Sequence, residues 1–168
     1  LMGALLELHP DPAGFLRRLN GLGIPGVTVT AERTHTQGIA GTHMHVLVHG
    51  QEEEFHHDHH DHHDHHDHHD HQGHPDHPDH DHHDHHDHDH HHSGMHEITH
   101  VIQALELPDQ VRRDAVAVYE SIAQAEAHAH GVPVTEVHFH EVGTLDAVTD
   151  VVGVCLLLHE LQVEEVLA

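Results

Sequence analysis

The sequence has few cysteines, aromatic residues and basic residues, and each shortage excludes something. A single cysteine excludes disulfides within the chain, which suits a reducing cytoplasm. That cysteine, Cys155, lies in an apolar run, where we expect a buried packing role rather than a reactive thiol. With no tryptophan, one tyrosine and three phenylalanines, the core must be aliphatic. The chain has five basic and 30 acidic residues, and the resulting net charge of −25 argues against nucleic acid as a partner.

The sequence also lacks a long apolar run. No segment approaches the ~18 to 20 consecutive apolar residues that a membrane span needs. No segment has the basic start and apolar middle of a signal peptide. We therefore expect a cytoplasmic protein with no membrane partner. The chain opens inside an apolar helical pattern at Leu1 and stops at residues 164–168, where a further strand is expected to begin, so we interpret it as a fragment.

Histidine is the residue that the sequence has in abundance. Residues 56–92, called the His/Asp tract below, contain 22 histidines and 11 aspartates. The exceptions are Gln72, Gly73, Pro75 and Pro78. Because the tract has no apolar side chain to compensate the entropy of ordering its backbone, we expect it to be a disordered insertion.

The chemistry of the His/Asp tract predicts metal binding. Imidazole is a good ligand for zinc, nickel, copper and cobalt, and carboxylates add charge and an occasional oxygen donor. A dense repeat binds according to the intrinsic preferences of its ligands, so the tract does not identify the metal. A solvated linker with incidental histidines is the alternative, which the composition disfavours. The ligands expected from the repeat include His57, His60, His63, His66, His83 and His86.

The segment before the tract predicts two short helices and a β-hairpin. Apolar residues recur at helical spacing over residues 1–8 and 13–22. β-Branched residues at 27–30 predict one strand, and residues 42–49, after Gly41, predict a second. On the second strand, alternate positions carry three histidines. A solvent-facing polar edge and a metal site both fit this face, and the first is slightly favoured. The three residues are His43, His45 and His49.

The segment after the tract predicts three helices. Their apolar periodicity covers residues 95–107, 109–129 and 145–161. On the first, His96 and His100 are four apart, a spacing that suits a shared ion but is common by chance.

Ionisable residues outside the tract are densest between residues 137 and 150. Two histidines alternate on an expected strand and a glutamate follows them. Two aspartates then lie four apart on a nearly apolar helix that Thr144 is placed to cap. Carboxylates on a buried helix are costly unless they are paired or bind a cation, so we interpret the cluster as a site. Its members are His138, His140, Glu141, Asp146 and Asp150.

Three segments resemble the LarC family of nickel insertion proteins. They are residues 125–131 (AEAHAHG), 137–143 (VHFHEVG) and 146–153. The opening at residues 1–6, the turn at residues 38–42 and the position of the His-rich insertion fit the same family. The resemblance therefore covers nearly the whole chain, without the aspartate- and glycine-rich start and the nucleotide-binding C-terminal half of the family.

The resemblance implies an activity and a set of partners. Family members are CTP-dependent cyclometallases that insert Ni²⁺ into pyridinium-3,5-bisthiocarboxylic acid mononucleotide, which makes the nickel-pincer cofactor. CTP with a divalent metal is expected only in the full-length protein. His138, His140, Asp150 and His130 are the expected metal ligands of the folded part. Glu141 or Asp146 is expected to accept the proton that the ring carbon loses.

Two other functions fit the residues. A non-enzymatic nickel or zinc store, or a metallochaperone, would use the folded flanks only to anchor the tract. A zinc-binding regulatory module would prefer zinc at the ordered site. Assembly into a homo-oligomer is left open.

The expected fold class is α+β, with helices packed on a small mixed sheet. Residues 1–55 would form a helical start plus a hairpin, and residues 56–92 the disordered insertion. Residues 93–168 would complete the same domain with helices and be truncated at the C-terminus.

Overall fold

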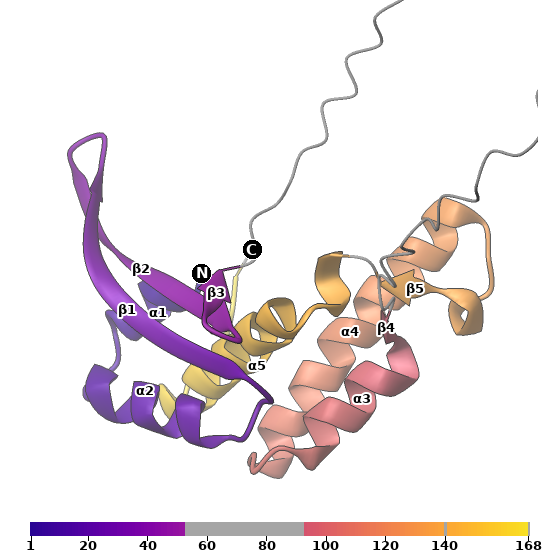
Figure 1. Ribbon diagram of the computed structural model, residues 1–168, viewed down its shortest axis with the longest axis horizontal. Helices are drawn as coiled ribbons and strands as arrows, with labels where there is room; N and C mark the ends of the chain where they lie inside the picture. Colours follow the sequence, from indigo (N-terminus) through magenta and orange to yellow (C-terminus); the bar gives the residue numbers. More distant parts are fainter. Residues whose placement is uncertain (53–92, 140, 168) are drawn as a thin grey trace, which may run out of the picture. The chain divides into compact units, whose positions relative to one another are not determined.

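The computed structural model describes residues 1–52, 93–139 and 141–167, without the side chains of Ser93 and Glu141. The expectations for the His/Asp tract, and for His140, therefore lie outside the described residues. Figure 1 labels the helices and strands of the described part.

The chain begins with the two expected helices, α1 (Met2–Leu6) and α2 (Pro12–Gly21). Asp11 caps α2, because its carboxylate accepts a hydrogen bond of 2.9 Å from the backbone N–H of Gly14. A proline at the first helical position has the φ angle that the helix needs. The α2 helix packs on the hairpin that follows and buries Phe15 and Leu19.

The hairpin is longer than the sequence predicted. Strands β1 (Val27–Thr36) and β2 (Ile39–Val48) pair antiparallel along their whole length. Gln37 and Gly38 connect them with φ angles of 52° and 83°, as in a two-residue type I′ turn. Gly41, expected to precede the second strand, therefore lies inside it. The closed end of the ribbon extends beyond the helices in Figure 1.

A second turn of the same kind adds a third strand. His49 and Gly50 have φ angles of 53° and 83°, and β3 (Gln51–Glu52) returns antiparallel to the end of β2. The strand order is β1-β2-β3. Because β3 is so short, the edge of β2 from residue 39 to 46 pairs only with β1.

The second half of the chain is mainly helical, as predicted. Its helices are α3 (Met95–Ala104), α4 (Asp109–His130) and α5 (Leu145–Glu160). The α4 helix ends at Gly131, whose φ of 66° terminates the helix in the left-handed conformation. The connections contain β4 (Ser93–Gly94), which pairs antiparallel with β5 (His138–Phe139), and the 3₁₀ turns η1 (Val134–Glu136) and η2 (Glu141–Gly143).

The α+β class is confirmed. In the part of the chain that the structure describes, every strand pairing is antiparallel, whereas a mixed sheet was expected. Residues 163–167 form neither helix nor strand, so the strand expected at residues 164–168 does not begin there.

Helix α5 joins the two halves of the core. It contacts α1, α3, α4, β1 and β2. The core is largely aliphatic, as the composition requires, although Phe15, Tyr119 and Phe139 are also fully buried in it. Cys155 is buried too, and burial raises the pKa of its thiol to about 11, which agrees with a packing role. Among the helices of the described ranges, none has both the length and the apolar character that crossing a membrane needs.

Candidate functional site

The first turn of α5 brings two carboxylates together. Asp146 lies half-buried in that turn and accepts a hydrogen bond from the Thr144 hydroxyl at the N-cap position. Asp150 follows one helical turn later. Partial burial, and then the charge of Asp146, raise the pKa of Asp150 above its ordinary value, and the amino group of Leu1 opposes this shift. A bound cation or a bound proton would therefore stabilise the Asp150 carboxylate beside Asp146.

Tyr119 of α4 fixes the turn that precedes these carboxylates. Its hydroxyl donates a hydrogen bond of 3.0 Å to the carbonyl of Val142 in η2, and its ring packs edge-to-face on Phe139 at 5.8 Å. Burial, together with the charges of Asp146 and Asp150, raises the pKa of the Tyr119 hydroxyl, which therefore stays a donor. The sequence analysis did not single out this tyrosine, whose partner lies 23 residues away.

A pocket of about 530 Å³ lies beside Asp150. Its walls are the start of α1, residues 42–44 of β2, and parts of α4 and α5. Apolar side chains form most of it, and Asp150 is the only carboxylate among the lining residues. These are Leu1, Met2, Gly3, Thr42, His43, Met44, Val118, Asp150, Val151, Val154 and Cys155.

Gly3 explains how α1 closes one side of this pocket. A Cβ at that position would lie 2.1 Å from the carbonyl oxygen of Thr42. The absence of a side chain lets α1 approach the backbone of β2 directly.

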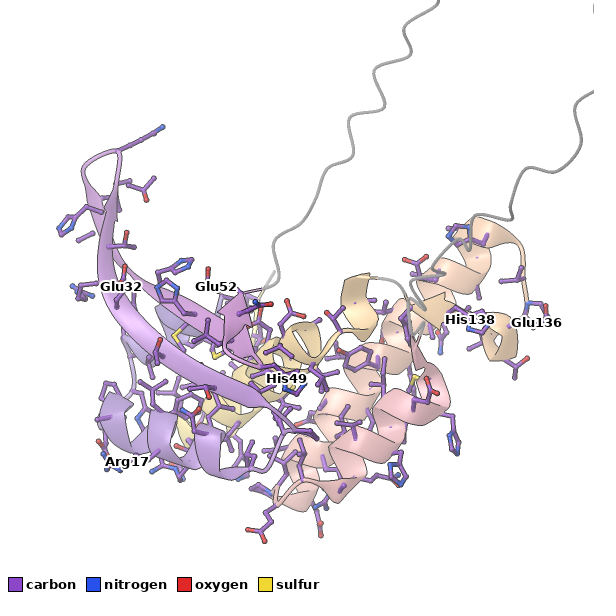
Figure 2. All side chains as sticks on the ribbon, in the orientation of Figure 1. Arg17, Glu32, His49, Glu52, Glu136 and His138 are labelled. Atoms are coloured by element: carbon purple, nitrogen blue, oxygen red, sulfur yellow. The ribbon has the colours of Figure 1, made fainter. Side chains whose placement is uncertain are left out.

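The other predicted residues of the folded site are placed apart or fall outside the described residues. His138 is exposed on β5, as Figure 2 shows, and pairs with Gly94 of β4. His130 is exposed at the end of α4, where its Nε2 lies 3.2 Å from Glu126. His140 and the side chain of Glu141 are not described. The structure thus brings Asp146 and Asp150 together, and the complete cluster stays a prediction.

The histidine pair on α3 shows no sign of a shared ligand. His96 and His100 are both exposed. The carboxylate between them, Glu97, accepts a hydrogen bond of 3.0 Å from the backbone of Gly94 and thereby caps α3.

On β2, two of the three aligned histidines do share a face. Within residues 1–52, 93–139 and 141–167, the one group of three or more side chains with metal-binding geometry consists of His43, His45 and Glu52. His49 does not belong to it, because the turn to β3 directs its ring over Gly26, where a Cβ would lie 2.4 Å from ring atom Cε1. Sequence reasoning missed Glu52, although the dipeptide His49-Gly50 was a signal for the turn that brings it there.

Comparisons with known proteins identify the family of the chain. The model of a family described as nickel insertion protein matches residues 1–168. A Lactiplantibacillus plantarum protein named pyridinium-3,5-bisthiocarboxylic acid mononucleotide nickel insertion protein is 37% identical over 99% of this chain and 36% of its own length. An Acetivibrio thermocellus protein of the same name is 31% identical over 99% of this chain and 34% of its own length. The chain thus spans about a third of these relatives. No solved structure matches it.

Proposed function

Because the chain belongs to the nickel insertion protein family, we propose that it is the nickel-handling part of an enzyme that inserts Ni²⁺ into pyridinium-3,5-bisthiocarboxylic acid mononucleotide. The observation that carries this proposal is the match of the family over all 168 residues, with relatives that are named for this substrate. A metal store or metallochaperone explains the His/Asp tract equally well. It gives no reason for the paired carboxylates and the pocket beside them.

In this proposal the His/Asp tract supplies the nickel. Its 22 histidines lie in the same chain as the folded site, so transfer between them is intramolecular and benefits from a high effective concentration. Imidazole must be neutral to bind a metal, and neighbouring carboxylates favour the imidazolium form. Protons therefore compete with nickel along the tract, and individual ions are released easily.

The start of α5 is the proposed place of the chemistry. As nickel binds the ring carbon of the precursor, that carbon loses its proton, and a carboxylate must accept it. Asp146, half-buried and oriented by Thr144, is one candidate acceptor, and Glu141 in the preceding turn is the other. Asp150, with His138, His140 and His130, would bind or position the metal.

The pocket beside Asp150 is the proposed place of the precursor. Its volume of about 530 Å³ lies within the ~300–1,000 Å³ that is typical of small-molecule sites. Arginine is absent from its described lining, whereas the precursor carries thiocarboxylates and a phosphate. Nickel that binds near Asp150 first would offset the repulsion between these anions and the acidic protein.

Further properties of the whole protein belong to the same proposal. We infer use of CTP with a divalent metal, membership of the lyase class and a cytoplasmic location. The isolated chain would be incomplete for turnover, because it spans only about a third of the relatives.

The proposal is tested with a full-length protein that contains this chain. Nickel incorporation into the precursor is followed by mass spectrometry, with and without residues 56–92, at limiting and at excess nickel. We expect the deletion to reduce insertion at limiting nickel and excess nickel to restore it.

Two outcomes would contradict the proposal. A store or chaperone would transfer no nickel to the precursor at any concentration, even with the tract intact. A zinc-binding regulatory module would show a calorimetric affinity for zinc well above that for nickel, and no response to the precursor.

A further inference from the structure

Histidine and glutamate side chains gather on the outer face of the hairpin, apart from the cluster at the start of α5. In β2, His43 and His45 project to the same side, because strand side chains alternate. Glu32 of β1 pairs with His43 in the β1–β2 ladder. Glu52 of β3 pairs with Leu47, which follows His45 by two residues and lies on the same face. Figure 2 labels Glu32 and Glu52, which belong to the strands on either side of β2.

The donor atoms of this group are close enough to share one ion. One ligand atom each from His43, His45 and Glu52 lies within 4.8 Å of the others. The two imidazole rings meet edge-to-face with centroids 4.4 Å apart. Nδ1 of His45 contacts the Glu52 carboxylate, and Nε2 of His45 lies 3.7 Å from Glu32.

An exposed network of ion pairs would explain only part of this arrangement. It accounts for His45 with Glu52 and Glu32, a type of interaction that contributes little at a protein surface. It does not account for the second imidazole, His43, against the first. The contact of Nε2 of His45 with Glu32, at 3.7 Å, is also too long for a hydrogen bond, and this ring nitrogen has no other hydrogen-bond partner in the described residues.

The donor set suits nickel in transit rather than nickel held permanently. Imidazole nitrogen and carboxylate oxygen are both accepted by Ni²⁺, and three protein donors leave further coordination positions open. Open positions allow an incoming ligand to bind before the protein ligands leave. A nickel ion that must finally move to sulfur and carbon ligands needs such a site.

The position of the group in the chain and in the fold fits this use. Glu52 precedes the first histidine of the tract, His56, by four residues in the sequence. At the other end, His43 lines the same pocket as Asp150. The group is therefore close in the sequence to the start of the His/Asp tract, and through His43 it adjoins the pocket in which insertion is proposed.

From this geometry we propose that His43, His45 and Glu52 bind one nickel ion in transit between the His/Asp tract and the α5 pocket, an inference that rests on the nickel insertion function proposed above. Glu32, farther from the rings, orients His45 and adds negative charge. The turn at His49-Gly50 brings Glu52 of β3 beside the two imidazole rings of β2.

Nickel binding at this site is tested first by NMR in a chain whose 22 tract histidines are replaced by glutamine, so that the tract does not take up the added metal. Substoichiometric Ni²⁺ is added to this ¹⁵N-labelled protein, and paramagnetic broadening is followed for each amide. We expect broadening around His43, His45 and Glu52, but not around His35, an exposed histidine of the same hairpin that lies on the opposite face. Equal broadening at His35, or none at the three ligands, would overturn the proposal.

Affinity is then measured by calorimetry in a full-length chain whose 22 tract histidines are replaced by glutamine. We expect about one nickel ion per chain, and an affinity that falls by more than about 100-fold in His45→Asn, since even partners outside the ligand set contribute roughly 10- to 100-fold. Glu52→Gln should cost at least about tenfold. His35→Ala is the matched control, and circular dichroism verifies that each variant folds. Unchanged affinity in His45→Asn would refute the site.

The binding measurements separate this inference from the proposed function. If nickel binds at the hairpin but the full-length protein inserts no nickel into the precursor, the proposed insertase function is wrong and the metal site stands. If the His45→Asn variant inserts nickel at the normal rate when nickel is limiting, the transit role is wrong and the proposed insertase function stands.

Discussion

The hairpin face and the start of α5 both gather ionisable side chains, but with different donors and different surroundings. The hairpin offers two imidazoles and a carboxylate on an exposed pleated surface, where neighbouring strands set their spacing. The start of α5 offers two carboxylates on a helix whose other residues are nearly all apolar. Imidazole nitrogens together with a carboxylate form a donor set that Ni²⁺ accepts, and a carboxylate can also accept a proton. Under the proposed function, this difference fits transit of nickel at the hairpin, and both reception of nickel and proton transfer at the start of α5.

The largest effect is expected when one carboxylate is removed from the start of α5, because this should stop the reaction and leave nickel binding at the hairpin intact. We expect Asp146→Asn to lower the rate of insertion in the full-length protein by roughly 100-fold or more, the usual contribution of a general base. Nickel binding at the hairpin should not change, because Asp146 lies outside that group. Single-turnover assays with saturating nickel measure the rate. Glu141→Gln tests the other candidate in the same way, and a normal rate in both variants would leave the proton without an acceptor on this turn.

A smaller effect is expected from the side chain that holds this turn in place. Tyr119→Phe removes the hydrogen bond to the Val142 carbonyl, which costs about 0.5–1.5 kcal/mol of unfolding free energy. Urea denaturation measures this loss. Ser121→Ala is the matched control on the same helix, because that hydroxyl donates to Ala117 at an exposed position. Equal stability of the two variants would show that Tyr119 does not anchor the turn.

The proton dependence of nickel binding should differ between the two regions. The hydrogen bond to Glu52, with the charges of Glu52 and Glu32, raises the pKa of His45 above its ordinary value of 6.5. A protonated ring keeps its ion pair and binds no metal. The stabilisation from that pair is therefore complete below pH 6.5 and is lost as pH rises through the raised pKa, and nickel affinity increases over the same window.

Glu52→Gln tests this proton competition, because it removes the main cause of the shift. We expect the pKa of His45 to fall and the onset of competition to move to lower pH. Histidine-resolved NMR titrations of the metal-free chain measure the pKa of His45 in both proteins. The ring of His43 is followed as the internal comparison, and Glu32 is left unchanged. A titration of His45 that is the same with and without Glu52 would disagree with the geometry. At Asp150, desolvation and the charge of Asp146 raise the pKa, whereas at His45 the carboxylate of Glu52 is the main cause of the shift.

The helices could be predicted from the sequence, and the full hairpin could not. Apolar periodicity identified all five helices within a few residues, since each buries one face. Residues 31–41 carry polar and small side chains without a clear alternation, so the pairing beyond residue 30 depended on recognising Gln37-Gly38 as the turn. An amide side chain followed by glycine, at a position that needs two positive φ angles, is a weak signal by itself.

The sites were predictable to the extent that they are local. Asp146 and Asp150, four apart on one helix, are close in the structure as the spacing requires. The hairpin group needed β3 to bring Glu52 beside His45, and the pocket needed α1, β2 and α5 to meet. These contacts join residues that are distant in sequence, and no periodicity encodes them.

A second histidine–glutamate pair, at the end of α5, differs from the one on the hairpin. Nε2 of His9 donates a 2.9 Å hydrogen bond to Glu160 at the end of α5, much as His45 contacts Glu52. There, however, the Arg18 guanidinium also binds both carboxylate oxygens and, through its hydrogen bond, holds the pKa of Glu160 below its ordinary value. The carboxylate is already neutralised by a fixed cation, and no second imidazole is near enough to complete a metal site within the described residues.

We therefore expect the smallest effect from Glu160→Gln. Stability should fall by about 1 kcal/mol, the usual net contribution of a hydrogen bond of this kind, and nickel binding should be unchanged. Because the folded-state pKa of Glu160 is lowered, its stabilisation is present at neutral pH and is lost as pH falls below about 4.5 toward the folded-state value. Thermal denaturation at pH 7 and pH 3 measures this difference, and calorimetry with Ni²⁺ measures the binding. A loss of nickel affinity in this variant would mean that histidine–carboxylate pairing alone attracts the metal, and the distinction between an occupied pair and an open donor set at the hairpin would no longer hold.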